Sequence, residues 1–316
     1  MKKYYSNILT ILIIIFFGLY IYNNFDDFLV LGSISPAKIF WLLCLYGATF
    51  IVNAYVYKIF FAYFNHKIGI SECVSFSIYS GIANLVMPFR SGAVARAVYF
   101  KNKFGLGITD FVSILGGTYL ISFAVLAVSG LIGISALSPE QNAGYYLLVG
   151  FLCLILFCCL IPILFKVSIP DKFIALKLLL IGKIFGKLAA ITKAWNDISK
   201  SKKTLWKLVL MVFVNFLLTV AIAAVEFETI GISLALAQLV LYSALSGLSM
   251  FVSITPSALG IREFVFILTS QIMGIGNQAI LNVAVIDRVV LMLFLIGAYL
   301  VIRLKSGYVL HNFRTD

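Results

Sequence analysis

The sequence predicts an all-α polytopic membrane protein with about six full transmembrane helices plus two re-entrant helical hairpins in an inverted-topology repeat. Of its 316 residues, 62% are hydrophobic and 11% are charged, whereas a soluble domain is about 45–50% apolar. Apolar runs recur at lengths near the roughly 20 residues that a helix needs to cross a bilayer. Basic residues, which give a net charge of +12, cluster at alternate ends of these runs, as the positive-inside rule requires. These observations exclude a soluble enzyme, a disordered chain and a coiled coil.

The N-terminal segment, residues 1–36, holds the first predicted span at about 8–31. Lys2 and Lys3 precede this span, so we expect the N-terminus to lie in the cytoplasm. No small-residue cleavage site follows the apolar run, which favours a retained helix over a secretory signal peptide.

The first repeat, residues 37–136, is predicted to contain two spans around a hairpin. The spans cover about 37–64 and 108–136, and the hairpin covers 71–104. Basic residues lie at both ends of the short apolar stretch 71–88, so the positive-inside rule places both ends in the cytoplasm. A stretch that enters and leaves on one face is re-entrant.

A linking helix is predicted over 145–165, followed by a basic segment over 166–204. Apolar residues recur within this segment at spacings of three and four: Phe173, Leu176, Leu180, Ile184, Leu188, Ile191, Trp195 and Ile198. This spacing predicts an amphipathic helix on the inner leaflet. The stretch Lys172 to Lys203 is expected to attract anionic inner-leaflet lipids; the alternative is that its lysines only set the topology.

The second repeat, residues 205–303, mirrors the first. Its spans are predicted at about 205–225 and 279–303, with a hairpin over 234–277 that enters from the opposite face. The tail, 304–316, follows a basic helix end, so both termini are expected to be cytoplasmic in a multi-pass protein of the cell membrane. The alternative topology has eight or more full spans and no hairpin.

Each hairpin carries a Pro-x-x-x-Gly sequence at its tip. The first has Pro88 and Gly92, and the second has Pro256 and Gly260. Proline breaks a helix and glycine permits a tight turn, and broken backbone at membrane depth is tolerated only inside protein or beside a wet cavity. Inverted repeats of this kind are typical of transporters, whose binding sites lie near the bilayer midplane.

Charged residues near the two tips and in the middle of the last span are predicted to bind a substrate: Arg90, Arg96, Arg262, Glu263, Asp287 and Arg288. Arginines suit the phosphate of a lipid. Arg90 and Arg262 are expected to hold the phosphate, and Arg96 is expected at the cytoplasmic mouth. One alternative is that the first two arginines only anchor the membrane surface, and another is that the last four residues form internal ion pairs that lock the second hairpin.

These motifs resemble a known family. Asn84 to Gly92 with a following Arg96, Thr255 to Glu263, and Asp287 with Arg288 are similar to segments of the membrane region of the lysylphosphatidylglycerol synthase/flippase family. The resemblance covers about 40–303. The sequence departs from the family at Ala93, where an acidic residue is usual, and at 117–119, where a charged pair is usual. Because only 13 residues follow Arg303, we expect the stand-alone form without the synthase domain.

The resemblance implies a lipid flippase or translocase, and not a lipid aminoacylase. We expect it to move an anionic or modified phospholipid, or a lipid-linked precursor, through a polar groove formed by the two hairpins. A separate lipid-modifying synthase is a candidate partner, and no nucleic acid is expected. With two histidines and no Gly-x-x-x-x-Gly-Lys-Ser/Thr motif, we expect no metal, no cofactor and no catalytic residue. The alternatives are a small-anion transporter and a membrane enzyme acting on a lipid-linked sugar.

Overall fold

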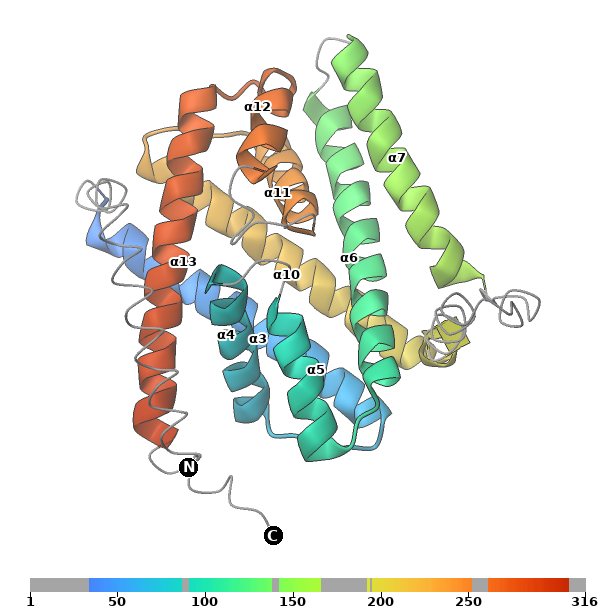
Figure 1. Ribbon diagram of the computed structural model, residues 1–316. Helices are drawn as coiled ribbons and strands as arrows, with labels where there is room; N and C mark the ends of the chain where they lie inside the picture. Colours follow the sequence, from blue (N-terminus) through green and yellow to red (C-terminus); the bar gives the residue numbers. More distant parts are fainter. Residues whose placement is uncertain are drawn as a thin grey trace.

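The computed structural model describes residues 34–86, 91–137, 142–165, 192–193, 195–251 and 261–306 (Figure 1). Every regular element in these ranges is an α-helix. In chain order the helices are α3 (Pro36–Tyr63), α4 (Ile70–Val86), α5 (Ser91–Phe104), α6 (Ile108–Leu137), α7 (Ala143–Leu164), α10 (Lys202–Thr229), α11 (Leu236–Phe251), α12 (Ile261–Met273) and α13 (Asn277–Ser306).

Five of these helices, α3, α6, α7, α10 and α13, are long and apolar enough to cross a membrane. They confirm five of the six predicted spans, while the sixth, at about 8–31, lies outside the described residues. The largest difference is at α10, which was predicted to end near 225 but continues to Thr229. Glu226 therefore lies inside a helix instead of in the predicted outer loop.

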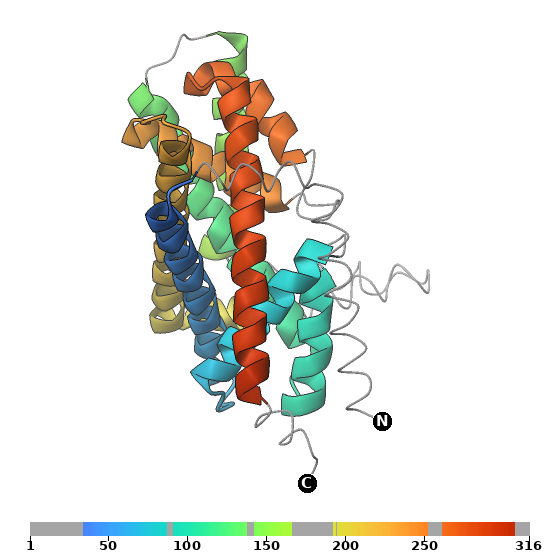
Figure 2. The ribbon, with the colours of Figure 1, turned by 90° about the vertical axis from the view of Figure 1, so that its left-hand side faces the viewer.

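The other four described helices are shorter. They contain 17 residues in α4, 14 in α5, 16 in α11 and 13 in α12, fewer than the roughly 20 needed to cross the bilayer alone. In Figure 1, α4 and α5 lie in the lower half of the molecule and α11 and α12 lie in the upper half. The view turned by 90° in Figure 2 keeps the two pairs in opposite halves.

Close helix packing supports the upper pair. Gly133 of α6 faces α11 so closely that a Cβ atom built on it would lie 2.9 Å from the backbone nitrogen of Leu241. Small residues allow such an approach between membrane helices, where dispersion contacts stabilise the interface. On the other side of α11, the ring of Tyr242 stacks on Phe266 of α12 with 4.3 Å between the ring centroids. The upper pair is thus joined to the long helices by a core of buried apolar side chains.

The end of the basic segment packs inside the protein. Trp195 is 4% exposed and Ile198 is completely buried. The indole Nε1 of Trp195 donates a hydrogen bond to the carbonyl oxygen of Pro162, 2.8 Å away, and the ring covers Gly117 of α6. The prediction that the apolar face of this segment lies on lipid is therefore wrong for these two residues, because they belong to a core cluster formed with α3, α5, α6 and α10. Residues 172–191 lie outside the described part of the chain.

Candidate functional site

The junction of α4 and α5 is built around Gly92. This buried residue lies in the first turn of α5, and its backbone N–H donates a hydrogen bond to Oδ1 of Asn84, 3.1 Å away. A Cβ atom at this position would lie 2.5 Å from both the carbonyl oxygen and the hydroxyl oxygen of Ser80. Glycine at this position therefore allows α4 and α5 to approach each other, and this contact determines the direction of the rest of α5. Pro88 and Arg90, at the tip between the limbs, lie outside the described residues.

One turn further along α5, Arg96 points into the protein. Its side chain is half-buried, its Nε donates a hydrogen bond to the carbonyl oxygen of Gly92 at 3.2 Å, and its guanidinium carbon lies 5.1 Å from the centroid of the Tyr57 ring on α3. Tyr119 of α6 lies within electrostatic range. The side chain is thus held in place by a carbonyl group and an aromatic face.

Arg96 carries a charge that no carboxylate neutralises within the described part of the chain. The ion pairs found there join Glu72 to Lys103 and Asp197 to Lys200, so neither involves Arg96. A cation away from bulk water is costly unless it is paired or solvated. A guanidinium can form two parallel hydrogen bonds to a phosphate or carboxylate. The arrangement therefore suits an anion as the missing partner.

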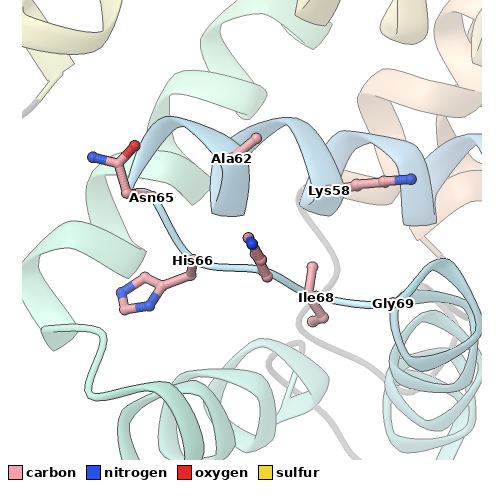
Figure 3. Close-up of a pocket in the computed structure, with 7 residues that line it drawn as sticks. Lys58, Ala62, Asn65, His66, Ile68 and Gly69 are labelled. Atoms are coloured by element: carbon pink, nitrogen blue, oxygen red, sulfur yellow. The ribbon is translucent and has the colours of Figure 1, made fainter.

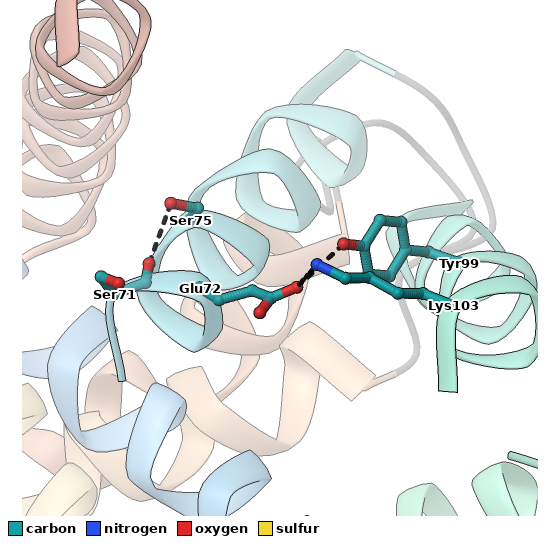
Figure 4. A network of polar contacts seen from close by, with 5 residues as sticks. All are labelled: Ser71, Glu72, Ser75, Tyr99 and Lys103. Carbon is teal, nitrogen blue, oxygen red and sulfur yellow. Dashed lines mark hydrogen bonds and ion pairs between the residues drawn. The ribbon is translucent and has the colours of Figure 1, made fainter. Parts of the chain in front are cut away.

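A polar network joins the start of α4 to the end of α5 (Figure 4). The Tyr99 hydroxyl donates a hydrogen bond to Oε1 of Glu72 at 2.9 Å, and the Lys103 ammonium group forms an ion pair with the same oxygen. Burial raises the pKa of Tyr99 to about 12, so its phenol stays protonated and able to donate. The network fixes α5 against α4 at the end opposite to Gly92.

The second predicted cluster is only partly described. Arg262 and Glu263 fall in the first turn of α12, but their side chains are not among the described parts of the structure, and Pro256 and Gly260 lie outside it. The predicted pairing of these charged residues with α13 stays a prediction.

A buried polar contact joins three of the long helices. The Tyr46 hydroxyl on α3 lies 3.2 Å from Oε1 of Glu226 on α10, and the carboxylate of Asp287 on α13 is also within hydrogen-bond distance of it. Glu226 is 1% exposed and Asp287 is half-buried. Arg288, the next residue on α13, has a fully buried Nε. Asp287 and Arg288 were predicted site residues, and the structure brings Asp287 together with a carboxylate that was not predicted.

Glu226 was missed because it was assigned to a loop. The available signal was its position in a long apolar run, between Val225 and Phe227 with no basic neighbour in the sequence. An acid in such a run needs a polar partner from another helix. In the described chain, no three acidic, histidine or cysteine side chains gather as metal ligands.

Comparison with known proteins identifies the family of the chain. No curated protein matches the sequence. Residues 7–298, which include the whole site described above, match the family described as the lysylphosphatidylglycerol synthase TM region. This match extends the resemblance seen at the hairpin motifs to nearly the full length. The chain is therefore a member of the lysylphosphatidylglycerol synthase TM region family.

Proposed function

We propose that the chain is a lipid flippase that moves an anionic or modified phospholipid, or a lipid-linked precursor, across the cytoplasmic membrane. The observation that carries this proposal is Arg96. Its half-buried side chain on α5 lies against an aromatic ring of α3 and has no carboxylate partner in the described part of the chain. A lipid phosphate supplies the negative charge that this position lacks. The family membership supports a role in membrane lipid chemistry.

The proposed path is a polar groove between two re-entrant hairpins, α4–α5 and α11–α12. Two features support it: all four helices are too short to cross the bilayer alone, and the pairs lie in opposite halves of the molecule (Figures 1 and 2). With the Pro-x-x-x-Gly tips, this is the pattern expected of an inverted repeat. In the proposed mechanism the headgroup enters the groove while the acyl chains stay in the bilayer.

In this proposal Arg90, Arg96 and Arg262 contact the headgroup phosphate, and Glu263, Asp287 and Arg288 set the charge of the pocket. Both termini are cytoplasmic, and any aminoacylation of the lipid is done by a separate synthase. The protein itself moves the lipid without changing its covalent structure.

The test is headgroup translocation in proteoliposomes that contain the purified full-length chain. We expect one of three lipids, phosphatidylglycerol, phosphatidylcholine or lysylphosphatidylglycerol, to cross faster than in protein-free vesicles. The same vesicles are tested for uptake of inorganic phosphate. Phosphate uptake without movement of any lipid would show a small-anion transporter instead. Covalent change of the added lipid would show an enzyme.

A further inference from the structure

A basic hollow lies at the turn between α3 and α4 (Figure 3). Its volume is about 570 Å³. The lining residues come from the end of α3 and from the turn itself: Lys58, Ala62, Asn65, His66, Lys67, Ile68 and Gly69. Figure 3 shows Lys58 and Ala62 on α3, with Ile68 and Gly69 on the chain segment that faces them. Two lysines and a histidine therefore line the hollow, and none of the described lining residues is acidic.

The surroundings make the hollow more positive. Helix α4 begins at Ile70, directly after the lining residue Gly69, so the positive end of its helix dipole lies at the rim. The acid that compensates such a helix start is Glu72. Its carboxylate is paired with Tyr99 and Lys103 on α5 (Figure 4). An anion in the hollow thus meets lysine side chains and the start of a 17-residue helix.

An apolar track leads to the hollow along α3. Ile51 is 47% exposed and Tyr55 is 44% exposed, and they share one helical face with the exposed Lys58 and Ala62. Because α3 is long and apolar enough to cross the membrane, this exposed face is suited to contact with lipid chains. The Lys58 ammonium lies 5.9 Å from the centroid of the Tyr55 ring. An aromatic ring followed by a lysine is typical of the membrane–water interface.

We propose that this hollow binds the phosphate of an anionic phospholipid from the adjacent leaflet, with the acyl chains along the exposed face of α3. Lys58, Lys67 and the start of α4 recognise the phosphate, and Ile51 and Tyr55 contact the chains. The apolar track favours a membrane lipid over free phosphate. The site is separate from Arg96 and does not depend on translocation, since a lipid can be held there whether or not the protein moves it.

Native mass spectrometry of the detergent-purified full-length chain tests the proposal by measuring the affinity for phosphatidylglycerol and for phosphatidylcholine. We expect the wild-type chain to prefer phosphatidylglycerol. The double variant Lys58→Gln/Lys67→Gln is expected to bind it about tenfold more weakly, because two cations that attract the headgroup are lost. The matched control is Lys101→Gln/Lys207→Gln, which removes the same charge from exposed positions on α5 and α10 and should leave the affinity unchanged.

Three results would overturn the assignment: equal affinity of the wild type for both lipids, equal losses in both double variants, or displacement of phosphatidylglycerol by inorganic phosphate at similar concentrations. The last result would identify a site for free phosphate. If the Lys58→Gln/Lys67→Gln chain does not fold, the same binding measurement on the Ala62→Glu variant tests the proposal. This exposed helical position accepts glutamate, and the new negative charge in the lining should weaken phosphatidylglycerol binding while phosphatidylcholine binding stays the same.

Discussion

Replacing Gly92 by alanine should push α5 away from α4. The new Cβ atom would lie 2.5 Å from the backbone oxygen of Ser80, whereas ordinary contact begins at 3.4 Å. A backbone atom cannot rotate away, so the helices must separate and the hydrogen bond from the Gly92 N–H to Asn84 is weakened. Overpacking costs about 1–3 kcal/mol and the lost hydrogen bond about 1 kcal/mol. The sum, about 2–4 kcal/mol, corresponds to a melting temperature lower by about 4–10 °C.

The assay is thermal unfolding of the purified chain in detergent, with Gly116→Ala as the matched control. Gly116 also lies inside a helix, but no described atom apart from its own helix backbone and chain neighbours lies within 4 Å of its Cβ position, so alanine there should leave stability unchanged or raise it by about 0.5–1 kcal/mol. Because Arg96 lies one turn after Gly92, the Gly92→Ala variant should also lose lipid translocation. If Gly92→Ala melts and transports like the control, the close contact between α4 and α5 is refuted.

Further predictions use the same unfolding assay. Tyr46→Phe removes a buried hydroxyl that contacts two carboxylates, with the loss of one hydrogen bond to a charged group, and should cost about 1.5–3 kcal/mol. Tyr55→Phe, on the exposed face of the same helix, should cost nothing; equal effects would contradict the buried contact. Gly117→Ala places a Cβ atom 2.0 Å from the ring of Trp195 and should destabilise the protein strongly relative to the Gly116→Ala control. A neutral result would show that the ring lies elsewhere. Glu72→Gln breaks a partly exposed ion pair and should cost at most about 1 kcal/mol, and a larger loss would mean that the network does more than fasten the helix ends.

The long helices were predictable because hydropathy and flanking charge determine them together. A span such as α6 must bury its backbone polar groups in its own hydrogen bonds, so its extent follows from the length of the apolar run. The end of α10 was not predictable in this way. Glu226 is a charged residue that follows the predicted end of the span, and its buried hydrogen-bond partner, Tyr46, comes from a distant segment.

In the candidate site, too, local features were predictable from the sequence and contacts between distant segments were not. The sequence pointed to Gly92 and Arg96 because helix breakers and intramembrane charges are rare in apolar chains. It could not show that the Tyr57 ring would lie against Arg96, because Tyr57 lies in another helix and carries no local signal. Trp195 was assigned to a lipid-facing stripe, since periodicity reveals an apolar face but not whether lipid or protein covers it.

The most direct test of the proposed transport is the initial rate of headgroup translocation in proteoliposomes for wild type, Arg96→Gln, Arg96→Lys and Lys101→Gln. Losing the charge-assisted hydrogen bonds of Arg96, about 1.5–3 kcal/mol, should slow Arg96→Gln by about 10- to 100-fold. Arg96→Lys should recover part of the rate, because lysine keeps the charge but not the bidentate geometry. Lys101→Gln, which removes the same charge from the exposed end of α5, should match wild type. Equal rates for Arg96→Gln and Lys101→Gln would contradict a headgroup site at Arg96.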